Sequence, residues 1–210
     1  MPAPAAARNP AVLRRRWRAA HLGVWLLSLV PAFKLCYDGF TGGLGVNPIE
    51  EITDRTGWWA LSLLVATLCI TPLRRLTRWN KAIAFRRQLG LTTFIYATLH
   101  VATYFVLDLG LDLSHIAEDI VERPFMTVGF LAWLILLTLA LTSTKGAMRR
   151  LGRRWQMLHR LVYAAAALAS LHFFWSQKAD RVEPLVFAGI FGLLLGLRLL
   201  WWRRRNRRGA

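Results

Sequence analysis

The chain has 210 residues, of which 55% are hydrophobic, yet its formal net charge is +17. Its Lys and Arg residues stand in short clusters between apolar runs of about 18 to 20 residues, as in transmembrane helices joined by basic loops. This pattern argues against a soluble nucleic-acid-binding domain, which basic charge alone would allow.

Six apolar runs, each long enough to cross a membrane as a helix, follow one another along the chain. They cover residues 19–37, 58–73, 88–107, 125–143, 155–175 and 185–202. Residues 38–57 are expected to form a loop, and SHIAEDIVERP, after the third run, a short surface helix. The first run lacks a small-residue cleavage site and is expected to be retained. The pattern predicts an all-α integral membrane protein with a six-helix transmembrane bundle.

The expected organisation is one six-span domain over residues 19–202, between an N-terminal tail (1–18) and a basic C-terminal tail (203–210). Six spans put both termini on one side of the membrane. The segments expected on that side hold 23 of the 28 Lys and Arg and none of the 11 Asp and Glu. They are residues 1–18, 74–87, 145–160 and 198–210. Under the positive-inside rule, both termini are cytoplasmic.

The segments between the spans are too short to fold a nucleotide-binding domain, and the chain contains no GxGxxG motif. A soluble redox partner must therefore bind from outside the membrane. Cys36 and Cys69 are expected near opposite faces of the membrane. A disulfide needs Cα atoms within about 7 Å, so these two are not expected to pair.

His100 and His172 lie in the third and fifth spans, which both run outward. They stand 12 residues beyond Gln88 and 15 beyond Met157, or about 18 and 22 Å along a helix. Two imidazoles at similar depth on separate helices are what a b haem needs, with aromatic residues around the porphyrin. Seven residues are expected to supply these surroundings: Phe94, Tyr96, Tyr104, Phe105, Phe173, Phe174 and Trp175. Spacing alone equally fits two buried histidines that bond to neighbouring helices.

His159 lies at the inner end of the fifth span, 13 residues before His172, and points to a different face of the helix. A second haem of the usual kind needs a histidine 13 or 14 positions before His100, where the chain has Arg87 and Arg86. Arginine pairs with haem propionates, flavin phosphate or anionic lipid instead. These residues are predicted to border an inner cofactor site that is differently ligated or holds no haem. The alternative is an interfacial histidine among arginines.

Two further histidines are expected outside the haem pair. His21 lies at the inner edge of the first span, at a depth similar to that of His159, where an interfacial role is the simplest interpretation. His115 lies in an acidic outer segment and is expected to be solvated.

Several stretches resemble a known family of membrane haem proteins. LGRRWQMLHRLVY resembles the signature of the ferric reductase-like transmembrane superfamily, which includes NADPH oxidases and STEAP metalloreductases. A closer resemblance, over about residues 20–201, is to the MsrQ (YedZ) family, the haem-binding subunits of bacterial periplasmic methionine-sulfoxide reductase systems. It rests on, in order, GGLGVNPIEEITDRTGWWAL, LLVATLCITPLRR, RRQLGL, YATLHVATYF, ERPFMTVGFLAWLILLTLALTST and LHFFWSQKAD.

The resemblance implies a multi-pass b-type cytochrome of the bacterial inner membrane, with one or two b haems and no substrate-reducing centre of its own. His100, His159 and His172 match the family's haem-linked histidines. Electrons would come from the quinol pool, with a bound FMN or a cytosolic flavin reductase as further candidate donors. They would pass to a periplasmic molybdenum-cofactor enzyme that reduces protein methionine sulfoxide.

A different class of function remains open from the residues alone. A small transporter or proton channel could use these histidines as proton relays. Intramembrane carboxylates would favour that reading, and none of the 11 acidic residues falls clearly inside an expected span.

Overall fold

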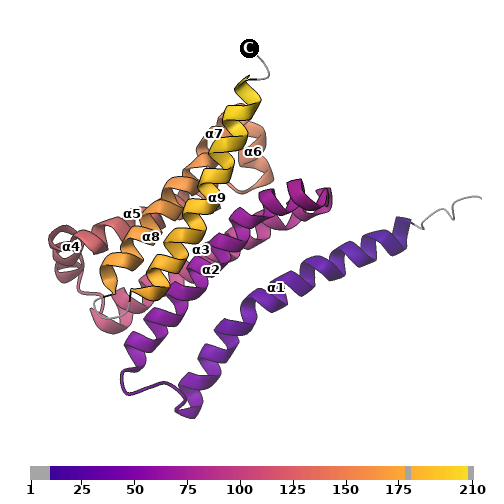
Figure 1. The fold of residues 1–210 in the computed structure, drawn as a ribbon. Coiled ribbons are helices and arrows are strands. Elements are labelled where there is room, and N and C mark those ends of the chain that lie inside the picture. Colours follow the sequence, from indigo (N-terminus) through magenta and orange to yellow (C-terminus); the bar gives the residue numbers. More distant parts are fainter. Residues whose placement is uncertain (1–9, 178–180, 208–210) are drawn as a thin grey trace, which may run out of the picture.

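The computed structural model describes residues 10–177 and 181–207, and every regular element in this part is a helix (Figure 1). The elements are α1 (Pro10–Thr41), α2 (Pro48–Thr77), η1 (Asn80–Phe85), α3 (Arg86–Ala102), η2 (Thr103–Asp108), α4 (Leu113–Glu122), α5 (Pro124–Leu141), α6 (Lys145–Leu151), α7 (Arg153–Leu158), η3 (His159–Leu161), α8 (Val162–Ser176) and α9 (Val182–Arg207). Residues 1–9 and 208–210 of the two expected tails lie outside the described part.

Six helical segments in the described part are long and apolar enough to cross a membrane, which confirms the predicted six-helix fold. Their helices run past the predicted spans because polar residues continue several of them beyond the hydrocarbon. The expected loop at 38–57 is wrong in extent, since α1 continues to Thr41 and α2 already begins at Pro48. Asn47 accepts a bond from the N–H of Glu50 and caps α2, and Pro48 suits a first helical turn.

The predicted surface helix is confirmed as α4. Asp112 caps it by accepting bonds from the backbone N–H groups of Ser114 and His115. A bond from the Ser114 hydroxyl and these two N–H groups hold the pKa of the Asp112 carboxyl at about 2. The capping carboxylate is therefore charged at any ordinary pH.

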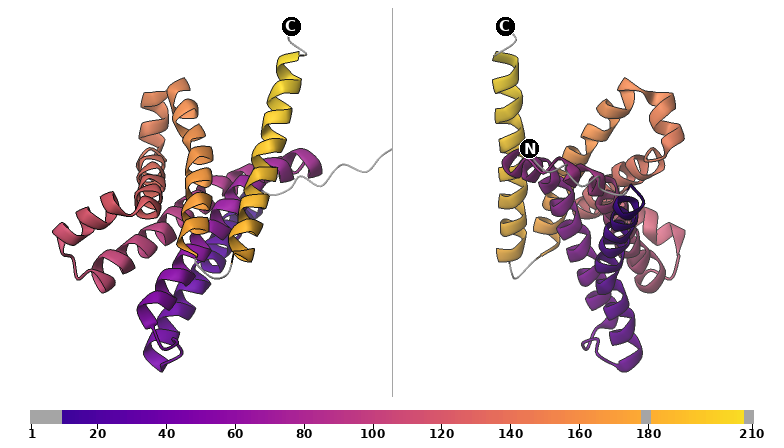
Figure 2. Two further views of the ribbon diagram at one scale, coloured as in Figure 1. Left: turned by 60° about the vertical axis from the view of Figure 1, so that its left-hand side comes forward. Right: turned by 90° about the vertical axis from the view of Figure 1, so that its right-hand side faces the viewer.

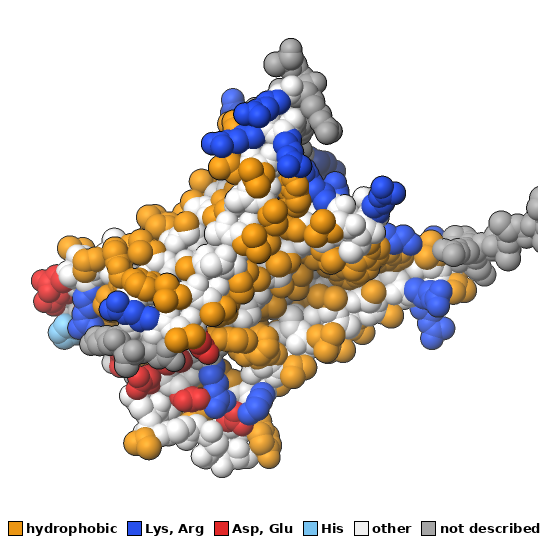
Figure 3. Space-filling view, in the orientation of Figure 1, with side chains coloured by type: hydrophobic (Ala, Val, Ile, Leu, Met, Phe, Trp, Pro, Cys, Tyr) orange, Lys and Arg blue, Asp and Glu red, His pale blue; other side chains and the backbone are white. Residues whose placement is uncertain are grey.

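The charged side chains gather at opposite ends of the molecule, with a hydrophobic surface between them (Figure 3). Basic side chains lie around the C-terminal end of α9 and the start of α1, and most acidic ones lie around α4 and the α1–α2 turn. The surface between them exposes large apolar side chains on α1 and α9, such as Leu27 and Leu193. This distribution suits a chain whose middle lies in lipid.

Two helix pairs make up the centre of the fold: α3 packs along α2, and α8 along α5. The α9 helix covers α2 and α8 and extends past the other helices at its C-terminal end (Figure 2). The buried apolar core lies between these helices and contains Leu61, Leu64, Leu68, Leu139, Val162, Ala166, Phe187, Phe191 and Leu194. By contrast, α1 diverges from α2 toward its own N-terminal end (Figure 1).

Prolines inside two of the spanning helices interrupt the backbone hydrogen bonds, and side chains from other helices bond the groups beside them. In α1, next to Pro31, the Tyr96 hydroxyl accepts from the N–H of Ala32 at 3.0 Å and donates to the carbonyl of Ser28 at 2.9 Å. In α2, Pro72 cannot donate to the carbonyl of Leu68, and the guanidinium of Arg198 donates to it at 2.7 Å. Such repair is what allows proline inside a transmembrane helix.

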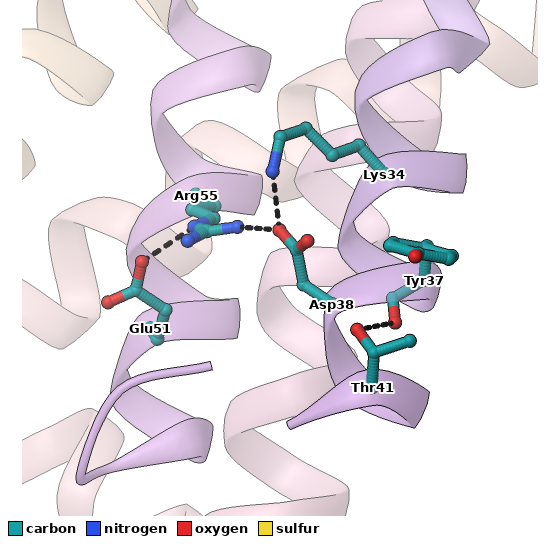
Figure 4. A network of polar contacts seen from close by, with 6 residues as sticks. All are labelled: Lys34, Tyr37, Asp38, Thr41, Glu51 and Arg55. Atoms are coloured by element: carbon teal, nitrogen blue, oxygen red, sulfur yellow. Dashed lines mark hydrogen bonds and ion pairs between the residues drawn. The ribbon is translucent and has the colours of Figure 1, made fainter. Parts of the chain in front are cut away.

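Charged side chains hold α1 to α2 at the acidic end (Figure 4). Asp38, whose side chain is largely buried, pairs with Lys34 at 2.7 Å and with Arg55 of α2 at 2.5 Å. Arg55 also bonds Glu51 at 2.6 Å. Because two cations share Asp38, the largely buried carboxylate is compensated.

Tyr96→Phe tests the repair at Pro31. It removes both bonds of the hydroxyl, and we expect it to lower the free energy of unfolding by about 1–3 kcal/mol. Thermal unfolding in detergent, followed by circular dichroism, measures the change. Tyr37→Phe, at an exposed position on α1, is the matched control. Equal stability of the two variants would contradict the role of Tyr96.

Candidate functional site

His100 of α3 and His172 of α8 lie opposite each other, and both line one cavity. Their ring centroids are 6.0 Å apart, and the ring planes are inclined by 79°. The pairing of α3 with α2 and of α8 with α5 brings the two rings to one depth. The structure thus brings together the two histidines that the sequence analysis placed on separate helices, and their role as metal ligands stays a prediction.

Each ring is oriented by a backbone carbonyl of the neighbouring helix. Nδ1 of His100 bonds the carbonyl oxygen of Thr53 at 2.8 Å, and Nδ1 of His172 bonds that of Phe125 at 2.8 Å. A carbonyl oxygen only accepts, so Nδ1 carries the proton in both rings. In the neutral rings Nε2 therefore keeps its lone pair. A histidine ligand needs such a second bond to fix its tautomer and orientation.

The two histidines line a cavity of about 630 Å³ between α2, α3, α5 and α8. This volume lies within the range of about 300–1,000 Å³ that is usual for cofactor sites. The described lining is mostly apolar and includes no Lys or Arg. Two carboxylate residues, Glu50 and Asp54, contribute to it from the first two turns of α2.

The aromatic surroundings of the cavity differ from those predicted. Tyr104, Phe105 and Phe173 line it, as expected. Four predicted residues do not: Phe94, Tyr96, Phe174 and Trp175. Tyr96 turns to α1 instead, where it bonds beside Pro31. Four lining aromatics were not predicted: Trp58 on α2, and Phe125, Phe130 and Trp133 on α5.

A π-helical segment, η2, begins three residues after His100, where α3 ends, and shapes one side of the cavity. Its wider turn brings the consecutive residues Tyr104 and Phe105 both into the lining. The Tyr104 hydroxyl bonds Asp119 of α4, which also pairs with Arg123. Segments of this kind are frequent at functional sites.

His159 lies apart from this cavity, in the 3₁₀ turn η3. Its Nε2 lies 3.1 Å from the Thr142 hydroxyl oxygen, and the Trp155 ring stacks on it with centroids 4.0 Å apart. The Thr142 hydroxyl donates to the carbonyl of Thr138, so it accepts from Nε2. His159 therefore carries its proton on Nε2, opposite to the outer pair, and no second histidine faces it among the described contacts.

The three arginines of this end of the bundle differ in how they relate to His159. The half-buried Arg86 acts electrostatically on both His159 and Arg198, whereas Arg87 is exposed. Arg198 of α9 was not predicted; it donates to the Tyr163 hydroxyl and to Leu68. Its position inside an apolar run was the available signal.

The remaining two histidines make local contacts. His21 exchanges two bonds with the buried Gln88: Nδ1 lies 2.8 Å from Oε1, and Nε2 of Gln88 donates to the His21 carbonyl at 2.8 Å. His21 thus joins α1 to α3. His115 is exposed on α4 and pairs with Asp112.

Comparison with known proteins identifies related chains. The family model described as "Ferric reductase like transmembrane component" matches residues 56–170. A protein-methionine-sulfoxide reductase heme-binding subunit MsrQ from Ralstonia nicotianae is 49% identical over 92% of this chain and 90% of its own. The MsrQ of Herminiimonas arsenicoxydans is 47% identical over 89% and 88%. That of Xanthomonas campestris pv. campestris is 54% identical over 79% and 75%. No solved structure matches.

The tautomers of the three histidines can be tested directly. In cofactor-free protein labelled with ¹⁵N-histidine, we expect His100 and His172 to be protonated at Nδ1, and His159 at Nε2. Nitrogen chemical shifts distinguish the two forms, and single His→Ala variants assign the signals. An Nε2-protonated His100 or His172 would contradict the orientation by Thr53 and Phe125.

Proposed function

The chain belongs to the ferric reductase-like transmembrane family and, within it, to the MsrQ subunits, and we propose that it is a transmembrane b-type cytochrome. In this proposal His100 and His172 would hold one b haem. The observation that carries it is the pair of adjacent rings, each with Nδ1 bonded to a carbonyl and no bond at Nε2 from the described residues. Bound haem would supply one-electron redox chemistry.

The residues present fit such a group. Two bonds of about 2 Å from imidazole nitrogens to one metal ion, together with the half-widths of the two rings, span a distance close to the observed 6.0 Å. The mostly apolar lining suits the faces of a porphyrin. Burial and the bonds at Nδ1 are the features by which this chain would tune the haem.

The inner group is a separate part of the proposal. His159, Arg86 and Arg87 border a second cofactor site, where a flavin phosphate or haem propionate would meet arginine. The lack of a second histidine opposite His159 favours FMN over a second bis-histidine haem. Electrons would enter from the quinol pool or from a flavin donor.

At the outer end, the chain would pass electrons to a periplasmic molybdenum-cofactor enzyme that reduces protein methionine sulfoxide. The relatives from Ralstonia nicotianae and Xanthomonas campestris are named as subunits of a methionine-sulfoxide reductase, which supports a partner of this kind. The acidic side chains on and around α4 offer a negative surface to a basic patch on that partner (Figure 3).

The visible spectrum of the purified protein tests the central proposal. Protein expressed with sufficient haem should show a Soret band, and dithionite should produce sharp α and β bands. A small transporter or proton channel with histidine relays would be colourless, and that result would overturn the proposal.

Single variants test the ligands. His100→Ala and His172→Ala should each lose most of the bound haem, because each removes one of two iron ligands. His115→Ala, at an exposed position on α4, is the control and should keep the full spectrum. If both ligand variants kept an unshifted spectrum, the assignment would be wrong even if the protein were a cytochrome.

The proposed orientation places both termini in the cytoplasm of a bacterial inner membrane. Alkaline phosphatase is active only outside that membrane, so a fusion within residues 109–112 should be active and one within 142–144 inactive. We expect the fusion within 142–144 to be inactive because the segment that follows it has an excess of Lys and Arg, which stay in the cytoplasm. The reverse pattern would contradict the orientation.

A further inference from the structure

The contacts of His100 and His172 repeat along the chain with the same spacing. Each histidine bonds a carbonyl 47 residues earlier, at Thr53 or at Phe125. In both cases a glycine, Gly57 or Gly129, follows that carbonyl by four residues. The carbonyl, the glycine and the histidine of the second group each lie 72 residues after their counterparts in the first. Similar spacing in two helix pairs indicates that the same local arrangement supports both rings.

Both glycines lie directly against the imidazoles. A Cβ atom at Gly57 would be 3.0 Å from Nδ1 of His100. A Cβ atom at Gly129 would be 2.5 Å from Nδ1 and 2.8 Å from Cε1 of His172. Both distances at Gly129 are shorter than the contacts that real Cβ atoms make. Only glycine therefore permits this approach of the His172 ring to the backbone.

The carbonyl and the glycine act from one turn of one helix. Residues four apart lie on the same helix face, so each turn presents an acceptor for Nδ1 and a surface without a side chain beside it. We call these the carbonyl–glycine pairs, Thr53–Gly57 and Phe125–Gly129. In each pair, the carbonyl fixes the rotation of the ring through the hydrogen bond, and the glycine limits that rotation through direct contact.

We propose that Gly57 and Gly129 are positioning residues, which with the carbonyls of Thr53 and Phe125 hold the imidazoles of His100 and His172 in planes inclined by 79°. This inference rests on the proposed haem ligation. A ferric haem held by two imidazoles in nearly perpendicular planes would give a strongly anisotropic low-spin EPR signal. The glycines therefore determine the EPR signal and the reduction potential, beyond the packing of the helices.

The test compares Gly57→Ala, Gly129→Ala and the control Gly192→Ala in the purified full-length protein. Gly192 lies in the spanning helix α9, and a Cβ atom there would meet nothing within 4 Å. Haem content, the low-temperature EPR spectrum and the midpoint potential are measured for each. Gly192→Ala should match the unaltered protein in all three.

Gly57→Ala should affect the bound haem less than Gly129→Ala does. Gly57→Ala requires a shift of a few tenths of an ångström, so it should keep its haem with a changed EPR signal and midpoint potential. Gly129→Ala must displace His172, and we expect its haem affinity to fall by about 10–100-fold, as for other residues that orient metal ligands. If Gly129→Ala does not fold, Gly57→Ala still tests the inference.

Two results would overturn this inference while leaving the proposed function intact. One is that both alanine variants keep the EPR signal and potential of the unaltered protein. The other is a lower yield of folded protein whose bound haem has an unchanged signal, since the glycines would then serve packing alone. A colourless unaltered protein would overturn the proposed function, and with it the inference.

Discussion

The hydrocarbon core of a membrane offers no water to backbone or imidazole groups, so each needs a partner inside the protein. Beside Pro31 and Pro72 these partners are side chains from other helices, Tyr96 and Arg198. At His100 and His172 it is the side chain that needs a partner, and a backbone carbonyl of the neighbouring helix accepts from it. In each case one bond both satisfies a polar group and joins two helices. The polar contacts that the membrane requires are therefore also contacts that position the candidate site.

The use of carbonyls at the histidines has a chemical consequence. A carboxylate would orient an imidazole equally well, but it would place a charge inside the hydrocarbon at a considerable free-energy cost. A helical carbonyl has a second lone pair, which it can offer to Nδ1 without leaving its own helix. The site thus obtains two neutral rings of defined tautomer from uncharged backbone. The nearby glycines let the rings come close enough to form these bonds.

The sequence was sufficient for the features that depend on local pattern. The six spans, the surface helix α4 and the common depth of His100 and His172 all follow from apolar runs and helical rise. The early start of α2 differs from the prediction although Asn47 and Pro48 are a recognisable helix start, because the acidic residues after them are also typical of an exposed loop. The role of Tyr96 could not be predicted, since the spacing along α3 does not reveal which helix covers each face. The carbonyl–glycine pairs could not be predicted either, because a contact through the backbone requires no particular side chain at the acceptor.

The similarity between the two helix pairs does not extend to the end of the bundle that holds Arg87 and His159. The offset of 72 residues that relates His172 to His100 relates His159 to Arg87, so one pair has an imidazole where the other has a guanidinium. His159 is also held differently, through Nε2 and a hydroxyl rather than Nδ1 and a carbonyl. The cavity at His100 and His172 is lined without Lys or Arg among the described residues, whereas Arg86 acts electrostatically on His159. The end at His100 and His172 thus suits a metal held between two neutral rings, and the end at His159 suits an anionic group beside a single histidine.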